Sequence, residues 1–335
     1  MQTIGYAIQN LCAPCVCSCA YCLLQNCHKT EGVDYFHGKK LAKRFVEWDK
    51  TNGNGMKLDY YGIAYTIEHP ELYDNLAFNQ SIGAPCGKFL QINGIRMRDE
   101  AETDALIKKL YAAGVTMIDT TFFGDEGYHD AFAGRKGDYR FMLRLASAIE
   151  KAGIVCAPSI PVFEDNKHLL DGLFGVLSQV VDPANIHFFL NDYRGHGEKV
   201  NHLRLTEEGY ASLSDTVKEH LNLNRHRTER DWLSGGELPE YTRRSLVISL
   251  LPDNIDLFEH MTCEEIIAHV EALDDAYYAS LPSINELAKL YGDPTDTRYY
   301  RVRDLAWKWQ NRYREEHGIT LYDVTDERLC HTIRS

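Results

Sequence analysis

The residues that could do chemistry are concentrated near the start of the chain. There, LCAPCVCSCAYC (residues 11–22) contains five cysteines, and Cys27 follows. The first residues, MQTIGYAIQN, have neither the basic segment nor the long apolar run of a signal peptide, so we expect a cytoplasmic protein with reduced thiols. The chain has 335 residues and ten cysteines, six of them between Cys12 and Cys27. This pattern predicts metal ligands rather than disulfides.

The spacing of the cysteines discriminates between kinds of metal site. Zinc ribbons separate two Cys-x2-Cys pairs by about 15–20 residues, but here the pairs Cys12/Cys15 and Cys19/Cys22 lie three residues apart. The bacterial and plant ferredoxin patterns do not fit either. One subset, Cys15-x3-Cys19-x2-Cys22, supplies three ligands, with the aromatic Tyr21 directly before the last of them.

This subset resembles the signature of the radical S-adenosylmethionine (radical SAM) enzymes. The resemblance implies that Cys15, Cys19 and Cys22 hold three irons of a [4Fe–4S] cluster. The fourth iron is then open to S-adenosylmethionine, as catalytic metal sites keep an open position. It also implies a reductant such as flavodoxin or ferredoxin, cleavage of S-adenosylmethionine to a 5′-deoxyadenosyl radical, abstraction of a hydrogen atom from the substrate, and oxygen sensitivity.

Three further cysteines, Cys12, Cys17 and Cys27, lie outside this motif. They are either bystanders in a cysteine-rich loop or substitute or auxiliary ligands, and the sequence leaves both interpretations open. With Cys12 or Cys17 added to the trio, the protein would be a non-catalytic iron–sulfur electron carrier with a four-cysteine cluster. A zinc-stabilised binding protein is a third class.

The elements that must position this loop alternate between strands and helices. Asp99 and Glu102 form a capping box at the start of one helix, and Gly114 and Gly153 follow the ends of two helices. Strands are predicted near residues 3–8, 57–65, 88–92, 115–121, 154–160 and 186–190, and helices near 38–49, 99–113, 139–152 and 167–180. The connection between the second and third strands is less clearly helical. The alternation predicts an α/β fold with a parallel sheet.

The resemblance implies a partial (β/α)6 TIM-like barrel over residues 1–203, with the cluster loop directly after its first strand. From residue 204 to 335 the strand signal fades, which predicts a mainly helical extension that packs on the barrel. Its helices are predicted at 207–221, 263–280, 284–290 and 298–317, with one further strand candidate at 246–251. Cys263 and Cys330 are isolated in this part, so we expect a single cluster.

The second strand bears on the binding of S-adenosylmethionine. The family usually ends this strand with Gly-Gly-Glu, whereas Ile63, Ala64 and Tyr65 stand at the corresponding positions here. Backbone carbonyl groups or Thr66 would then take over the contact with the methionine amine. A literal Ser-Gly-Gly-Glu occurs at 234–237, but it lies after the predicted barrel and is interpreted as a coincidence.

The later strand ends provide the other implied contacts. Asn93 begins an Asn-Gly pair that resembles the one after the family's third strand, although a plain turn explains it equally well. Thr120 and Thr121 would offer a hydroxyl group to the methionine carboxylate or the ribose. Arg135 would grip that carboxylate with two hydrogen bonds, unless it is a structural or solvated arginine. Leu190 would contact the adenine through its backbone.

The composition restricts the partners. Lysine and arginine number 36 and the acidic residues 49, and the resulting net charge of −13 argues against a general binder of nucleic acid or anionic membrane. No apolar run approaches the roughly 18–20 residues that span a bilayer. We expect a small-molecule or short-peptide substrate. Arg194 and His196 are candidates for contacts with it, the alternative being that they belong to a tight turn.

Overall fold

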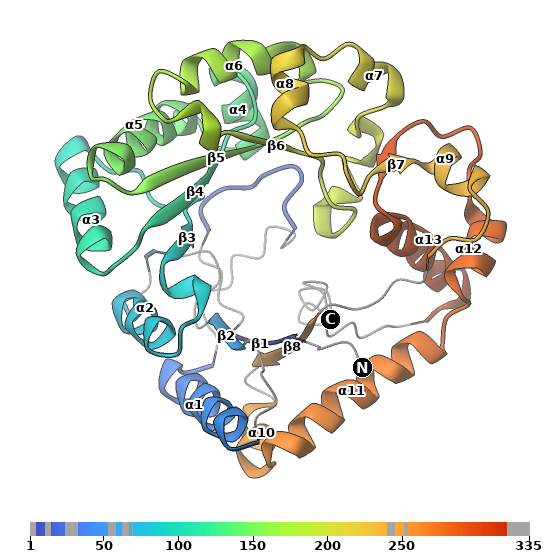
Figure 1. The fold of residues 1–335 in the computed structure, drawn as a ribbon, viewed down its shortest axis with the longest axis horizontal. Helices are drawn as coiled ribbons and strands as arrows, with labels where there is room; N and C mark the ends of the chain where they lie inside the picture. Colours follow the sequence, from blue (N-terminus) through green and yellow to red (C-terminus); the bar gives the residue numbers. More distant parts are fainter. Residues whose placement is uncertain are drawn as a thin grey trace.

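The computed structural model describes residues 5–10, 15–23, 33–52, 58–61, 67–68, 70–239, 245–250 and 254–319. From residue 35 to about residue 190 its elements follow one another around a ring in sequence order, with the helices mainly on the outside, and the C-terminal part then returns to the start of the chain (Figure 1). No helix among these residues is both long and apolar enough to span a membrane.

A four-stranded parallel sheet forms one side of the ring. It consists of β3 (Phe89–Gln91), β4 (Met117–Thr121), β5 (Val155–Pro161) and β6 (His187–Phe189), hydrogen-bonded in sequence order. Because all four strands run in the same direction, their carboxyl ends lie at one edge of the sheet, where parallel α/β folds place their sites.

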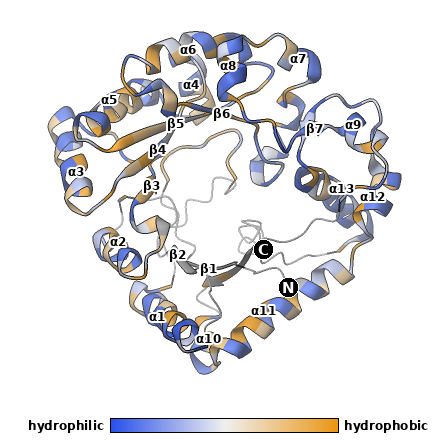
Figure 2. Ribbon diagram, viewed as in Figure 1, coloured by the Kyte–Doolittle hydropathy of each residue, from blue (hydrophilic) through white to orange (hydrophobic). Residues whose placement is uncertain are grey.

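Helices cover the outer face of this sheet. They are α3 (Glu100–Ala112), α5 (Asp138–Lys151) and α6 (Leu170–Leu177). The predicted capping box is present, since the Asp99 side chain accepts from the Glu102 N–H at 2.8 Å and Glu102 accepts from the Asp99 N–H at 3.2 Å. The apolar faces of the three helices pack on alternate strand residues such as Ile118 and Ile160, and together they form the largest core cluster. Figure 2 shows the more polar faces of these helices turned outward.

A second parallel sheet contains the start of the chain. Its order is β2 (Leu58–Tyr61), β1 (Gly5–Asn10) and β8 (Ser245–Leu250). All six predicted strands are therefore present, and the further candidate at 246–251 pairs with β1 although it lies far along the chain. The described residues give no pairing between β2 and β3, so closure into a partial barrel stays a prediction. The connection between these strands contains α2 (Leu72–Ser81).

The C-terminal part packs against both sheets. The helices α10 (Ile255–His260) and α11 (Cys263–Ala279) share a core cluster with β8 and α1 (Tyr35–Asn52), which includes Phe45 and Ile266. The helices α12 (Ile284–Tyr291) and α13 (Val302–His317) form another cluster, around Trp309. The short helix α9 (Glu229–Ser234) precedes β8 in the chain.

Two predicted helices in this part were wrong in extent. Residues 207–221 form two helices, α7 (Glu207–Ala211) and α8 (Asp215–His220), because Ser214 accepts from the Val217 N–H and starts a new helix. The helix predicted at 298–317 begins only at Val302. Tyr299 and Tyr300 before it form β9, which pairs antiparallel with β7 (Arg227–Thr228).

Candidate functional site

The cysteine loop, residues 15–23, is held against the carboxyl end of the four-stranded sheet. The Val16 N–H donates to the carbonyl oxygen of Gly94, just after β3, at 2.9 Å. The Ser18 N–H donates to the carbonyl oxygen of Ala133, at the end of α4 (Glu126–Ala133), at 2.9 Å. Backbone hydrogen bonds thus fix the loop independently of its side chains.

The segment after β6 holds the other end of the loop. The His196 N–H donates to the carbonyl oxygen of Cys22 at 2.9 Å. Gly195, with φ +55°, lies so close to the Leu23 backbone that a Cβ atom there would overlap the Leu23 carbonyl oxygen. His196 was predicted as a substrate contact, with a tight turn as the alternative. Its backbone contacts lie in such a turn, and its contact with a substrate stays a prediction.

The three predicted ligands, Cys15, Cys19 and Cys22, are half-buried in this loop, and none of them forms a disulfide with another described residue. Among the described residues, no group of three His, Cys, Asp or Glu side chains is arranged to hold a single metal ion. Three thiols in one loop that backbone hydrogen bonds hold in place are the donor set that a [4Fe–4S] cluster with one open iron requires, and the cluster itself stays a prediction.

The sulfur of Cys15 packs directly against the backbone of Gly94. Gly94 has φ +60°, and a Cβ atom at this position would overlap the Cys15 sulfur. The sulfur therefore occupies space that only a glycine leaves open. Its neighbour Cys17 and burial raise the pKa of the Cys15 thiol.

Tyr21 lies within an aromatic cluster contributed by the chain after β4 and β5. Its ring centroid is 5.5 Å from that of Phe123, 5.8 Å from Phe132 and 6.4 Å from Phe163. Burial raises the pKa of its hydroxyl well above the ordinary value, so Tyr21 stays neutral. This packing fixes the turn between the last two cysteines of the motif.

Asn93 and Thr121 join the ends of β3 and β4. The Asn93 Nδ2 donates to the Thr121 hydroxyl oxygen at 2.9 Å, and the Thr121 N–H donates to Asn93 Oδ1 at 2.8 Å. Thr120 points to the other face of the strand, where it is fully buried with its hydroxyl 3.7 Å from the Cys156 sulfur. Because side chains alternate along a strand, Thr121 lies on the face of β4 that meets Asn93 and Thr120 on the opposite face, and their contacts with S-adenosylmethionine stay predictions.

Asp119 is a candidate site residue that the sequence analysis did not name. It precedes Thr121 by two residues and lies on the same inner face of β4, where its carboxylate accepts from the Ser159 hydroxyl at 2.8 Å. Burial raises the pKa of Asp119 to about 6, and the hydrogen bond from Ser159 only partly opposes this. The signal that could have revealed it was strand alternation back from Thr121.

Arg135 makes structural contacts. Its guanidinium group pairs with Asp138 and donates to the carbonyl oxygen of Ile95, and its side chain is 13% exposed. Burial alone would raise the pKa of Asp138, but the hydrogen bond from His129 and the charge of Arg135 hold this pKa below its usual value. These contacts favour the structural interpretation of Arg135. Its predicted grip on the methionine carboxylate stays a prediction.

Two further predicted residues follow β6. Leu190 is buried directly after this strand, and Arg194 faces Asp192 with 3.4 Å between the guanidinium and carboxylate atoms.

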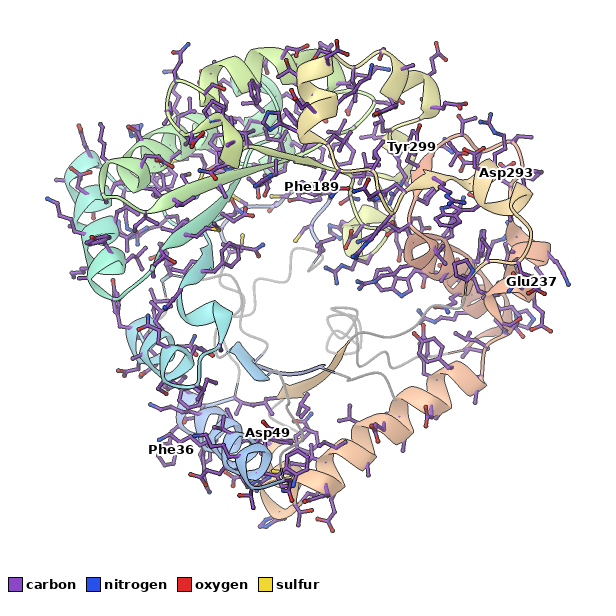
Figure 3. The ribbon with its side chains drawn as sticks, viewed as in Figure 1. Phe36, Asp49, Phe189, Glu237, Asp293 and Tyr299 are labelled. Carbon is purple, nitrogen blue, oxygen red and sulfur yellow. The ribbon has the colours of Figure 1, made fainter. Side chains whose placement is uncertain are left out.

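The Ser-Gly-Gly-Glu segment lies away from the inner side of the sheet. Phe189 lies on the inner side of β6 in Figure 3, whereas Glu237, from this segment, lies at the outer edge and is exposed. This position agrees with a coincidental match. Thr66, the preceding residues 63–65, Cys12 and Cys27 lie outside the described residues.

Comparisons with known proteins extend this description. No family model matches the sequence, and no curated protein matches it. Among solved structures, anSMEcpe with bound AdoMet aligns with a TM-score of 0.51 at 12% identity, covering 98% of this chain and 100% of its own. Streptococcus suis SuiB bound to S-adenosylmethionine gives a TM-score of 0.40 at 11% identity, covering 56% of this chain and 40% of its own.

A third structure is the radical S-adenosylmethionine methyltransferase TsrM from Kitasatospora setae, with a TM-score of 0.30 at 12% identity, covering 55% of this chain and 35% of its own. This chain therefore spans well under two thirds of SuiB bound to S-adenosylmethionine and of TsrM, but matches anSMEcpe along almost its full length. At these identities the likeness concerns the fold. The chain shares the fold of anSMEcpe with bound AdoMet, which agrees with the fold that the radical SAM resemblance implies.

Proposed function

We propose that this chain is a radical SAM enzyme that cleaves S-adenosylmethionine reductively and abstracts a hydrogen atom from a small-molecule or short-peptide substrate. The observation that carries the proposal is the placement of the cysteine loop. Three half-buried thiols with radical SAM spacing lie at the carboxyl edge of a parallel sheet, fixed by the segments after β3, β4 and β6. The fold shared with anSMEcpe supports it.

The residues of the loop and the strand ends would divide the work. Cys15, Cys19 and Cys22 would hold a [4Fe–4S] cluster, which when bound supplies the electron for cleavage and leaves one iron open. Tyr21 holds the loop in shape through its aromatic neighbours. The two hydrogen bonds between Asn93 and Thr121 place polar groups at the carboxyl ends of β3 and β4, the edge of the sheet against which the loop is held. Thr66, Arg135 and Leu190 remain proposed contacts of S-adenosylmethionine.

The architecture we propose is a partial (β/α)6 barrel in which the two parallel sheets belong to one curved wall. Residues 204–335 would form the extension, with β8 contributed to the sheet that contains β1. A reductant such as flavodoxin or ferredoxin would complete the system.

A non-catalytic carrier with four cysteine ligands is the competing function. It requires Cys17 or Cys12 as the fourth ligand. The Cys17 thiol is buried and donates to the Asp138 carboxylate at 3.7 Å, which disfavours the first of these arrangements. Cys12 lies outside the described residues, so only experiment separates the second.

The test is anaerobic reconstitution with iron and sulfide, followed by dithionite and S-adenosylmethionine and measurement of 5′-deoxyadenosine. We expect product from the wild type and none from the Cys15→Ala/Cys19→Ala/Cys22→Ala variant. Cys86→Ala, which removes a half-buried cysteine outside the loop, is the matched control and should keep the activity.

Two results would contradict the proposal. One is a bound [4Fe–4S] cluster whose electron paramagnetic resonance (EPR) signal does not change when S-adenosylmethionine is added, which would indicate a closed four-cysteine carrier. The other is a protein that retains zinc but no iron and sulfide, which would indicate a zinc-stabilised binding protein. The EPR readout does not depend on the substrate, so it holds even where cleavage requires the substrate.

A further inference from the structure

The sequence places a thiol at every second position from Cys15 to Cys19, and nothing in their spacing tells Cys17 apart from its neighbours. The structure does separate them. Cys17 is 3% exposed, whereas Cys15 and Cys19 are half-buried. Its sulfur lies 3.7 Å from the Asp138 Oδ2 atom, a partner 121 residues further along the chain.

Asp138 is the centre of a buried hydrogen-bonded group. The Phe123 N–H donates to His129 Nδ1 at 3.3 Å, so the hydrogen of this imidazole is on Nε2, which faces Asp138 Oδ2 at 3.3 Å. The other oxygen, Oδ1, accepts from Arg135 Nε at 3.1 Å. Asp138 is 4% and His129 0% exposed, so one carboxylate and one guanidinium balance each other in a site closed to water.

Asp138 is the first residue of α5, yet it does not cap that helix. The N–H groups at the start of α5 donate instead to Asp130, from Gly137 to Oδ2 at 2.5 Å and from Tyr139 to Oδ1 at 2.9 Å. Carboxylates at helix N-termini usually serve as caps. Because Asp130 fills this role, the Asp138 carboxylate can turn inward to Cys17.

We infer that Asp138 is a positioning residue that selects the cluster ligands, by holding the Cys17 thiol in its buried place. A thiol that is 3% exposed and hydrogen-bonded to a buried carboxylate is less accessible to iron than the half-buried thiols of Cys15 and Cys19. Asp138 thereby leaves three ligands instead of four, and an open iron for S-adenosylmethionine. This selection rests on the proposed function, but the placement of Cys17 does not.

The first experiment tests the placement in the metal-free protein by timed alkylation with iodoacetamide and mass spectrometry. We expect Cys17 to react at least tenfold more slowly than Cys19. Asp138→Asn should accelerate Cys17 about tenfold, whereas Asp130→Asn, which weakens the cap of the same helix without touching Cys17, should leave its rate unchanged. Equal rates for Cys17 and Cys19 in the wild type, or no acceleration in Asp138→Asn, would overturn the inference.

The second experiment tests ligand selection in reconstituted protein. Cys17→Ser keeps a donor for Asp138 and removes the spare thiol, so we expect iron and sulfide contents equal to those of the wild type and an unchanged EPR response to S-adenosylmethionine. In Asp138→Asn the fraction of cluster that responds should fall, and adding Cys17→Ser should restore it. A loss of iron in Cys17→Ser would show that Cys17 is itself a ligand.

These outcomes separate the inference from the proposed function. If no cluster binds although Asp138 protects Cys17 from alkylation, the proposed function fails and the placement stands. If the cluster binds and S-adenosylmethionine is cleaved although Cys17 alkylates freely, the proposed function stands and the inference fails. If Asp138→Asn does not fold, the wild-type alkylation rates and the iron content of Cys17→Ser still decide the question.

Discussion

Replacing Gly94 with alanine tests the geometry of the cysteine loop most directly. Gly94 has φ +60°, and a Cβ atom there would overlap the Cys15 sulfur. The left-handed backbone costs a residue other than glycine about 1–2 kcal/mol, and forcing extra volume into a packed site costs about 1–3 kcal/mol. We therefore expect Gly94→Ala to lower the free energy of unfolding by about 2–5 kcal/mol.

Gly83→Ala is the matched control. Gly83 has φ +72°, but nothing lies within 4 Å of a Cβ atom built on it. It should therefore show only the backbone cost of about 1–2 kcal/mol. The smaller conformational freedom of alanine in the unfolded chain applies to both variants and cancels in the comparison. The difference between them isolates the contact with Cys15.

Measuring Gly94→Ala again in a Cys15→Ala background completes a double-mutant cycle for the contact between these two residues. Without the sulfur, the nearest atom to the new Cβ is the Cβ of residue 15, at 3.3 Å. The cost of Gly94→Ala should then fall close to that of Gly83→Ala, and the coupling between the two sites should be about 1–3 kcal/mol. Urea unfolding of the metal-free variants measures each free energy.

The iron content after reconstitution provides a second readout, because Gly94→Ala should lower it and Gly83→Ala should not. The reasoning is refuted if Gly94→Ala is no more destabilising than Gly83→Ala in the wild-type background. It is also refuted if the cost of Gly94→Ala is the same with and without the Cys15 sulfur. Either result would mean that Cys15 does not lie against Gly94.

Three further predictions concern stability, each measured by urea or thermal unfolding. Asn93→Ala should cost about 1–3 kcal/mol, because the buried Thr121 N–H loses its acceptor; a neutral result would contradict this pairing. The pKa of Asp119 is about 6 in the fold against 3.8 ordinarily, so its ionised form destabilises the fold by up to about 3 kcal/mol above pH 6 and not below pH 4. Asp119→Asn should therefore stabilise the protein at pH 7.5 but not at pH 4, and an equal effect at both pH values would count against this. Asp304 is fully buried and paired with Arg301, so Asp304→Asn should cost about 3–5 kcal/mol. Arginine charges outweigh burial and lower the pKa of Asp304, so this stabilisation should be constant from pH 5 to 8 and decline only in stronger acid; a decline already near pH 6 would argue against the pairing.

The sequence predicted the local elements well because their causes are local. The capping box of Asp99 and Glu102 and the glycine stops at Gly114 and Gly153 depend on neighbouring residues, and the structure contains all of them. Of the two errors in helix extent, the break at Ser214 has a local cause that the prediction overlooked, and the other arose where a distant partner decided the outcome. Tyr299 and Tyr300 continue a helical pattern, yet they form a strand because their backbone pairs antiparallel with β7.

In the candidate site, too, some features follow from neighbouring residues and others from distant ones. Cys15, Cys19 and Cys22 were selected from the sequence because their spacing resembles the radical SAM signature. The choice between Thr120 and Thr121 required knowing which face of β4 the helices cover. Asp119 was missed for the same reason, because its position beside Ser159 depends on the register of β4 and β5.

The sequence by itself therefore determined that three closely spaced thiols follow a strand in an alternating α/β chain, because composition, caps and spacing are properties of neighbouring residues. Tertiary structure decided which of the alternating thiols are buried. Cys17 is hydrogen-bonded to Asp138, and Arg135 pairs with the same carboxylate, because packing brings α5 against the loop. Such buried partners are set by the three-dimensional path of the chain, and no local pattern specifies them.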